Sequence, residues 1–491
     1  MKIFKKILSL CISTLLLAAF SLPICAFSAE STNIAKDVDY VITTEANIDN
    51  AFPKKKIDDK KKILTDGVKG DISDLFGGKW LVLYRGLSHT ITLDFGKEML
   101  VNGYSIGFAQ AKNVGIHCTR SISFSVSADG ENFYTVNLDE DNSVPSSTAK
   151  QRIEKKFAGE KNYKARYVNI SFTTDVFNYV DELEIFGSNV GDAAETKYTA
   201  DPQKTYKNAF ASNKNPKMNN ISDLVLMYNG EYYNKIISDV GKNTSEELLP
   251  YAAYLDKSGK ILDTMFDSFL FLPLNPGEDF SHSLKNQAGW ESYLNNTIGK
   301  SESINLTALN NTVGDLKGSL KLDKSYKVNV FLTVPFLQYS SDVFGNLDGE
   351  NAIAPNSLEN RKSIIKWYID LFISQYKAQD FQNLNLVGFY WYSEGLSYAD
   401  DPNEDMFVKA FNEYVHSKNL ASIWIPYYCS PGFDKWQELG FDCATLQSGY
   451  AFPKDSKHET GNPLKGTCND SMSIAKKYGL GVEIELSLVN D

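Results

Sequence analysis

The sequence predicts a multidomain chain in which an all-β sandwich precedes an α/β barrel of the TIM (β/α) type. Residues 31–190 alternate apolar and polar side chains over short stretches, which is typical of strands with one buried face. Residues 222–491 contain near-continuous apolar runs separated by segments of helical period, as expected for a parallel sheet. Residues 191–221 are polar and lack a period, so they are predicted to link the two domains.

The first 29 residues have the pattern of a secretory signal peptide. Lys2, Lys5 and Lys6 precede an apolar run over residues 7–20, and small residues follow that run. The pattern predicts that residues 1–29 are removed and that the mature protein is secreted or extracellular. Because the run is shorter than the roughly 20 residues of a membrane span, we expect no stable membrane insertion after cleavage.

Short strands with one buried face follow the signal segment. Residues 90–95, 122–126 and 168–172 each place apolar side chains at alternate positions. Such alternation predicts strands that bury one face and expose the other. Asp129 and Gly130 follow one of these runs, and the glycine permits the positive φ of a hairpin turn. These features together indicate a β-sandwich.

Five segments of this region stand in a characteristic order: 64–67, 91–96, 124–130, 165–170 and 181–187. In that order they resemble the coagulation-factor type C (F5/8 type C, discoidin-like) jelly roll, which many carbohydrate-binding modules share. The resemblance implies a structural calcium site at Asp66 and Glu182, whose carboxylate oxygens suit that ion. Without a metal, these two residues are a turn cap and a surface acid. Candidate ligand contacts in the predicted loops are Trp80, Tyr84, Arg85 and Arg120.

Seven apolar runs after the linker predict parallel strands buried on both faces. They cover residues 224–228, 265–272, 328–334, 386–391, 421–425, 443–446 and 481–486. Residues 358–376 and 405–416 have helical period between runs. Seven such strands predict a (β/α) barrel over residues 222–491 that lacks its last βα unit. We expect a truncated barrel, and the alternative is an open seven-stranded sheet with an exposed edge.

The residues that close these strands predict a sugar-binding rim, because active sites of such barrels gather at the carboxyl ends of the strands. Aromatic rings offer flat apolar faces for a pyranose, and amides or carboxylates bind its hydroxyls. The predicted substrate-binding residues are Tyr228, Trp391, Tyr392, Trp424, Tyr427, Tyr428, Gln447, Tyr450 and Glu483. The alternative for any one of the aromatics is that it caps the barrel core.

Two glutamates are the predicted catalytic pair. Glu394 closes the fourth run, and Glu485 lies near the end of the seventh run. Glycoside hydrolysis requires two carboxylates, one to protonate the leaving oxygen and one to attack the anomeric carbon. Their positions resemble those of the large clan of retaining glycosidase barrels, although Ser393 stands where that clan usually has asparagine. We therefore expect Glu394 to be the acid/base and Glu485 the nucleophile.

The C-terminal region also resembles an uncharacterised domain family of secreted bacterial proteins, which often stands beside discoidin-like modules. The resemblance is carried by residues 227–230, 266–271, 388–391, 424–428, 440–442 and 481–485. It implies a glycosidase-like barrel and a glycan substrate. The sequence thus predicts a secreted glycoside hydrolase with an attached carbohydrate-binding sandwich. The alternatives are a non-catalytic polysaccharide-binding surface or matrix protein and a protein-binding adhesin.

Composition narrows the partners and cofactors. The chain of 491 residues has a formal net charge of -11, which opposes binding to nucleic acid and favours a neutral polysaccharide or glycoconjugate. Its five histidines lack the spacing of a zinc site, so we expect no metal or cofactor in catalysis. Cys429 and Cys443 are equally compatible with a disulfide and with buried free thiols.

Overall fold

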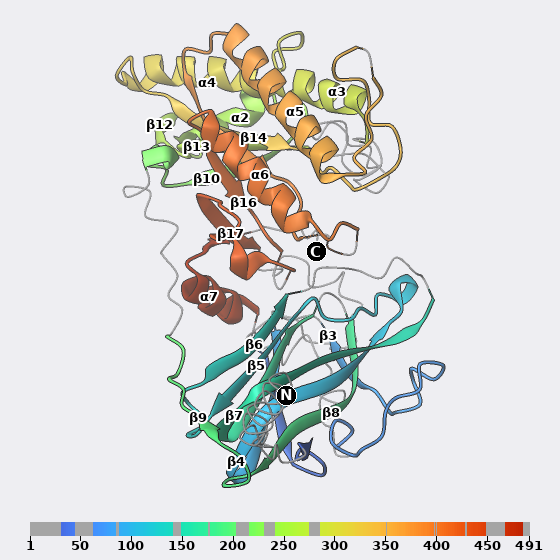
Figure 1. Cartoon of the computed structure of the whole chain (residues 1–491). Coiled ribbons are helices and arrows are strands. Elements are labelled where there is room, and N and C mark those ends of the chain that lie inside the picture. The colour runs from blue at the N-terminus through green and yellow to red at the C-terminus, as the bar shows by residue number, and fades with distance from the viewer. Residues whose placement is uncertain are drawn as a thin grey trace, which may run out of the picture.

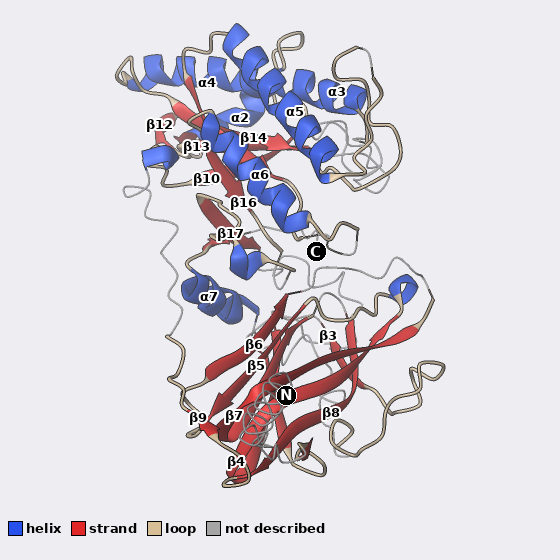
Figure 2. Cartoon of the chain, in the orientation of Figure 1, coloured by secondary structure: helices blue, strands red, loops and turns tan. Residues whose placement is uncertain are grey.

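The computed structural model contains a β-sandwich and a parallel sheet covered by helices (Figures 1 and 2). It describes residues 31–44, 62–84, 88–140, 149–174, 177–202, 216–229, 241–273, 285–349, 351–396, 398, 400–427, 430–447 and 467–484. The predicted signal peptide, residues 1–29, lies outside the described residues. No helix in the described ranges is long and apolar enough to cross a membrane.

The sandwich is built from antiparallel strands, with one short parallel pair between β7 and β9. The strands are β1 (Thr32–Asn33), β2 (Tyr40–Thr44), β3 (Leu81–Tyr84), β4 (Ser88–Gln110), β5 (Ser121–Ser127), β6 (Tyr134–Glu140), β7 (Gln151–Thr173), β8 (Phe177–Asn189) and β9 (Glu195–Thr196). Their main order is β1-β8-β4-β7-β5-β6, while β2 pairs with β4 and β3 with β8. The predicted all-β sandwich is confirmed.

Strands β4 and β7 run through both layers of the sandwich. The first part of β4 pairs with β2, and its later part pairs with β8. The register against β7 shifts between Asp94 and Met99, where Gly96 has φ 69°. A glycine adopts this left-handed conformation without steric cost, so the strand can turn a corner there. Apolar side chains from both layers, including Tyr104 and Phe124, form the core between them.

A buried polar network lies at one end of the sandwich. His89 Nδ1 is 2.9 Å from Thr174 Oγ1, which donates to Asn178 Oδ1 at 2.5 Å. The Asn178 amide in turn donates to the carbonyl of His117 at 2.7 Å. Burial lowers the pKa of His89 to about 4, so its imidazole is neutral in the folded protein near pH 7. The network ties the loop before β5 to strand β8.

The pKa of His89 predicts a loss of stability in acid. The unfolded histidine has a pKa near 6.5, so between about pH 6.5 and pH 4 only the unfolded chain binds this proton. The contribution of neutral His89 to the free energy of unfolding is therefore fully present above pH 6.5. It falls by about 3 kcal/mol on acidification to pH 4. Urea unfolding of the wild type and His89→Gln at pH 4.5 and 7.5 tests this, and the variant should show the smaller loss. Equal losses in both proteins contradict the prediction.

The predicted linker is shorter than residues 191–221. Strand β9 pairs with β7, and the ring of Tyr198 stacks on Tyr134 while its hydroxyl donates to the Lys164 carbonyl at 2.9 Å. At the other end, Met218 and Ile221 are buried in the C-terminal domain. Single apolar residues thus anchor both ends of this polar segment to the neighbouring cores.

The C-terminal domain is organised around a seven-stranded parallel sheet. Its order is β10 (Leu224–Asn229), β13 (Ser268–Pro273), β14 (Val328–Val334), β15 (Leu384–Trp391), β16 (Ala421–Trp424), β17 (Cys443–Gln447) and β18 (Gly481–Glu483). Each strand pairs with the next in the chain, apart from the small antiparallel ribbon of β11 (Ala253–Leu255) and β12 (Ile261–Thr264). The sheet is curled into half of a barrel.

The helices cover one face of this sheet (Figure 2). They are α2 (Ser245–Ala252), α3 (Gln287–Ile298), α4 (Asn305–Leu320), α5 (Leu358–Ala378), α6 (Glu404–Ser417) and α7 (Thr467–Tyr478). Side-chain oxygens cap the N-termini of three of these helices. Thr244 and Glu247 form a capping box at α2, and Asn286 and Ser357 cap α3 and α5. These caps satisfy backbone N–H groups that have no partner within the helix.

Alternate residues of each strand belong to two different cores. Phe269, Phe271 and Phe389 pack against the helices, whereas Leu270 and Phe331 point into the concave face. This alternation follows from the pleat of a strand, which sends successive side chains to opposite faces. It explains the near-continuous apolar runs of the sequence, and it decides which strand-end residues reach the concave face.

Candidate functional site

The candidate site lies where the central strands of the parallel sheet end. Glu394 follows β15 and is exposed, and its Oε1 accepts a hydrogen bond from Gln447 Nε2 at 2.9 Å. The Tyr427 N–H donates to the Glu394 carbonyl at 2.9 Å, and Tyr427 pairs with Gln447 in a parallel bridge. Three predicted residues, from the ends of β15, β16 and β17, are thus brought together.

Tyrosines and a second glutamate surround this carboxylate. Burial raises the pKa of the Tyr390 hydroxyl well above its usual value, and the charges of Glu394 and Glu483 raise it further. Burial followed by the Glu394 charge also raises the pKa of Tyr392. Tyr228 adds a smaller electrostatic contribution that also raises the pKa of both hydroxyls. The hydroxyls remain protonated and can donate hydrogen bonds.

Glu483 joins this group through the register of the sheet. Gln447 and Glu483 are direct partners in the parallel pair of β17 and β18, so their side chains leave the sheet on the same face. Val482 and Ile484 are exposed, the latter at 83%. Glu483 therefore shares a face of the sheet with Gln447, whereas its two apolar neighbours are exposed to solvent.

Two predicted rim residues lie on the opposite face. Trp391 is 3% exposed and packs against Phe407 and Phe411 of α6. Trp424 is fully buried and stacks on Phe441, with its Nε1 donating to the Ser393 carbonyl at 2.6 Å. The prediction that both line a sugar pocket was wrong, because the pleat points them toward the helices. Both belong to the core between the sheet and the helices, and Trp424 bonds to the start of the loop that follows β15.

Tyr390 is the residue of this group that the sequence prediction missed. It is buried in the concave face, with its ring centroid 6.5 Å from that of Tyr392. Strand alternation could have found it, because Tyr390 and Tyr392 are two residues apart and Trp391 stands between them. Three other predicted site residues, Tyr428, Tyr450 and Glu485, lie outside the described residues.

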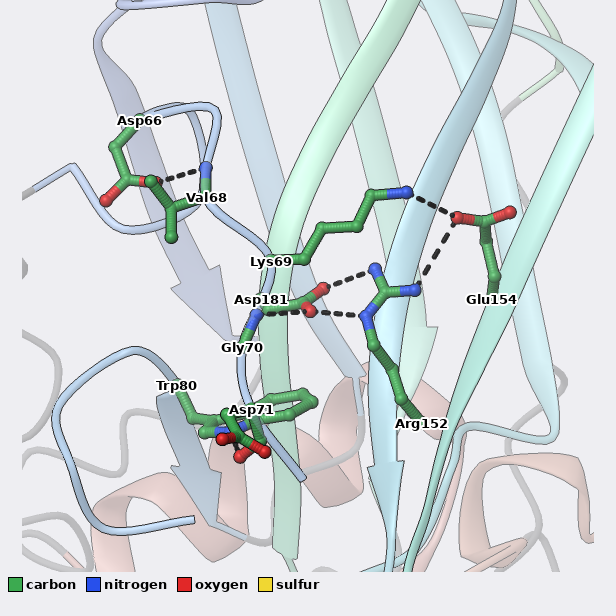
Figure 3. Close-up of polar contacts among 9 residues, drawn as sticks. All are labelled: Asp66, Val68, Lys69, Gly70, Asp71, Trp80, Arg152, Glu154 and Asp181. Carbon is green, nitrogen blue, oxygen red and sulfur yellow. Dashed lines mark hydrogen bonds and ion pairs between the residues drawn. The ribbon is translucent and has the colours of Figure 1, made fainter. Parts of the chain in front are cut away.

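The sandwich contains the second predicted site, at Asp66 and Glu182. Glu182 is 3% exposed, and its Oε2 accepts the Gly67 N–H at 2.9 Å while its Oε1 is buried without a hydrogen-bond partner. Asp66 Oδ1 accepts the Val68 N–H at 2.8 Å (Figure 3). Burial raises the pKa of Glu182 to about 7, and the Asp66 charge adds to this rise.

This pair has the chemistry of a cation site. A divalent cation would bind the unpaired Oε1 of Glu182 and would offset the repulsion between the two carboxylates. No group of three or more His, Cys, Asp or Glu side chains gathers at a metal-like distance in the described part of the chain. A cation at Asp66 and Glu182 would therefore take its other ligands from backbone carbonyls and water.

The loop that carries Asp66 is fastened to the sandwich by a buried carboxylate. The Asp181 carboxylate accepts hydrogen bonds from Arg152 Nε at 2.5 Å and from Arg152 Nη2 at 2.9 Å. It also accepts a hydrogen bond from the Gly70 N–H at 2.9 Å (Figure 3). Trp80 is buried, and its Nε1 donates to the Asp71 carbonyl at 3.1 Å. The Trp80 ring is therefore a structural element of the loop, not the exposed ligand contact that the sequence suggested.

The cysteine alternatives are resolved for Cys443. It is a free, buried thiol in β17, and burial raises its pKa to about 12. A thiol with so high a pKa is unreactive at neutral pH. Cys429, its partner in the disulfide alternative, lies outside the described residues.

Comparison with known proteins confirms the predicted resemblance of the sandwich. A model described as the F5/8 type C domain matches residues 42–185. Similar solved structures include a family-32 carbohydrate-binding module produced by Clostridium perfringens, with 15% identity over 32% of this chain and 99% of that chain and a TM-score of 0.22. The chitosan-binding module 1 of a chitosanase/glucanase from Paenibacillus sp. IK-5 has 16% identity over 32% and 98% of the two chains, with a TM-score of 0.21. An f-lectin from the serum of Morone saxatilis has 14% identity over 33% and 51%, with a TM-score of 0.23.

The comparison with curated proteins finds no match. The C-terminal resemblance is confirmed by a second family model, described as "Domain of unknown function (DUF4855)", which matches residues 223–489. This match covers 267 of the 491 residues, and the chain therefore belongs to that family.

Proposed function

We propose that the chain is a secreted, glycan-active protein and that its C-terminal domain is a glycoside hydrolase of the TIM-barrel type. One observation carries the proposal. At the carboxyl edge of a parallel sheet, the Glu394 carboxylate is bonded to Gln447 and lies within electrostatic reach of the Tyr390 and Tyr392 hydroxyls. A carboxylate, an amide and hydroxyl donors on one concave face suit a sugar, because each sugar hydroxyl can both donate and accept a hydrogen bond.

The geometry supports Glu394 as the general acid/base. A hydrogen bond from Gln447 to Oε1 fixes the orientation of the carboxyl group, and a group held in this way can exchange a proton with a glycosidic oxygen. The buried Tyr390 hydroxyl beside it supplies a donor that stays protonated at neutral pH. Glu485 is the proposed nucleophile of a retaining mechanism, and Glu483 the group that orders the neighbouring tyrosines.

The sandwich is proposed to hold the glycan while the C-terminal domain acts on it. Its match to the F5/8 type C domain supports this role, and the formal charge of -11 favours neutral polysaccharides over anionic ones. Removal of residues 1–29 as a signal peptide would place the mature protein outside the cell. Polysaccharides are abundant partners in that compartment.

The first experiment combines hydrolysis and affinity on the same substrates. The full mature chain is incubated with xylan, β-glucan, galactan, chitosan and polygalacturonate, and reducing ends and bound protein are measured for each. We expect reducing ends from at least one neutral polysaccharide and the weakest binding to anionic polygalacturonate. Absence of both binding and hydrolysis on all five contradicts the proposal for these glycan classes.

The exposure of Glu394 favours a second candidate function, that of a non-catalytic polysaccharide-binding surface or matrix protein. A general acid gains its proton most readily when burial disfavours its charge, whereas Glu394 lies in solvent. In that case Gln447, the tyrosines and Glu394 would only bind sugar hydroxyls. Tight binding without release of reducing ends from any substrate would establish this function instead.

Calcium is proposed as a structural ion of the sandwich, with Asp66 and Glu182 as side-chain ligands. The buried Glu182 Oε1 is the observation that supports it. We expect 1 mM Ca²⁺ to raise the melting temperature by several degrees, since an ion that binds only the folded state stabilises it. The increase should vanish in Glu182→Gln and persist in Glu184→Gln, which changes a neighbouring acid of the same strand. No increase in the wild type would show that the pair is a turn cap and a buried acid.

A further inference from the structure

The two domains meet at an arginine of the sandwich. Arg120 precedes β5 and is 8% exposed, and its Cζ lies 3.3 Å from the centroid of the Tyr398 ring in the C-terminal domain. A guanidinium at this distance over an aromatic face is attracted by the ring quadrupole. A second contact between the domains joins Lys435 Nζ to Glu140 Oε1 at 3.6 Å. The loop end of the sandwich therefore contacts the C-terminal domain.

Tyr398 belongs to the same loop as Glu394, the connection from β15 to α6. Its ring is 2% exposed, and its hydroxyl donates to Asp405 in the first turn of α6. The ring is thus held between Arg120 of one domain and a helix of its own domain. Because Tyr398 is four residues from Glu394, the position of its ring constrains the path of the loop.

Other described residues of the loop form hydrogen bonds on either side of Glu394. Leu396 N–H donates to the Pro431 carbonyl at 3.0 Å, and Ser393 Oγ donates to the Gly395 carbonyl at 2.7 Å. The Glu394 carbonyl accepts from Tyr427. These bonds fix the start of the loop, whereas Tyr398 anchors its middle. Arg361 also holds Asp401 at 2.6 Å, so Tyr398 is the described anchor between Leu396 and Asp401, and its loss would loosen the stretch that follows Glu394.

Arg120 itself stands on a rigid support. Cys118 N–H donates to the buried Gln110 Oε1 at 2.7 Å, and the His117 carbonyl accepts from buried Asn178 at 2.7 Å. Thr119 Oγ1 donates to the Ser121 carbonyl at 2.8 Å. Residues on both sides of Arg120 are therefore hydrogen-bonded to the sandwich. Arg120 thus has a fixed position from which it can hold Tyr398 in the β15–α6 loop.

We propose that Arg120 is a positioning residue for Glu394, acting through Tyr398, so that the sandwich completes the candidate site instead of serving as a separate module. The sequence suggested Arg120 as a ligand contact, but its guanidinium is covered by the Tyr398 ring. The consequence for activity rests on the proposed function. The consequence for the loop does not, and the two can be measured separately.

Hydrogen exchange of the full chain tests the effect on the loop without any substrate. In Arg120→Ala, amides of residues 392–404 should exchange at least tenfold faster, while the β4 and β7 core of the sandwich remains protected. Arg166→Ala is the matched control, because Arg166 pairs with Asp94 and lies 5.0 Å from the Tyr167 ring within the sandwich alone. Arg120→Gln, which removes the cation but keeps a polar side chain of similar length, gives the same test with less disturbance of folding.

Variants of the ring separate positioning from general destabilisation. Tyr398→Phe keeps the face over Arg120 but loses the hydroxyl bond to Asp405, so residues 392–404 should exchange faster than in the wild type and more slowly than in Arg120→Ala. Tyr398→Leu should match Arg120→Ala, and the double variant should add nothing further. Unchanged exchange in both Arg120→Ala and Tyr398→Leu overturns the proposal, whether or not any glycan is hydrolysed.

If a substrate is found, kcat and KM give the second readout. Loss of Glu394 positioning should lower kcat at least tenfold in Arg120→Ala with little change in KM, and Arg166→Ala should change neither. Faster loop exchange with unaltered kcat would refute the link to Glu394 while leaving the contact itself intact. Failure to detect hydrolysis by the wild type would refute the proposed function, and the exchange result would still decide the positioning of the loop.

Discussion

Replacement of Glu394 by Gln is expected to lower glycan turnover about 100- to 10,000-fold, the usual contribution of a general acid/base. The amide has the shape of the carboxyl group but cannot deliver or accept the proton. Gln447 donates to Glu394 Oε1, and it can donate equally to an amide oxygen, so the loop should keep its geometry. Reducing-end release under saturating substrate measures the loss.

Affinity for the same polysaccharide separates the two candidate functions. In an enzyme, Glu394→Gln should bind within a few-fold of the wild type while turnover collapses. Glu413→Gln, an exposed acid on the outer side of α6, is the matched control and should behave as the wild type. Hydrolysis that survives in Glu394→Gln would remove this residue from the catalytic role and require another acid.

Replacement of Arg361 by Ala is expected to destabilise the C-terminal domain by about 3 to 5 kcal/mol. Arg361 is 1% exposed, and its Nη1 donates to Asp401 at 2.6 Å and to Glu404 at 2.7 Å. Its Nη2 donates to the Leu337 carbonyl at 3.0 Å, and its guanidinium lies 3.7 Å from the Phe407 ring centroid. Removal of the arginine leaves two buried carboxylates without their cation, and burial already raises the pKa of Glu404.

Chemical denaturation at pH 7 measures this effect. Lys362→Ala is the matched control, because Lys362 is the next residue of α5 and forms an exposed pair with Glu359 at 2.8 Å. Exposed pairs of this kind contribute at most about 1 kcal/mol. A loss in Arg361→Ala as small as that of the control would show that solvent reaches the cluster and that its charges need no partner.

The sequence predicted the strands and the order of the two domains because these depend on local patterns. Alternation in the sandwich and continuous apolar runs in the C-terminal domain both reflect how many faces of a strand are buried. Each of the seven runs overlaps one of the seven strands of the sheet. The order of Glu394, Tyr427 and Gln447 at successive strand ends also follows from a parallel sheet, and the structure joins these residues.

Which side of the sheet a strand-end residue occupies was harder to predict. Trp391 and Trp424 have the chemistry of sugar platforms, but the pleat sets their direction, and in β15 a register shift between Leu386 and Gly388 precedes Trp391. The register shift in that strand cannot be read from residue types. Tyr390 was missed for the same reason, because its neighbours in sequence were judged by type and not by face.

The sequence alone determined the sandwich, the parallel order of the C-terminal strands, the order of the two domains and the group of polar residues at the strand ends, since all of these arise from periodicity and chain direction. Only the tertiary structure decided which aromatics face inward and that Arg120 lies over Tyr398. Residues 278 positions apart in the chain meet there, and no local pattern encodes a contact that depends on how two completed domains pack.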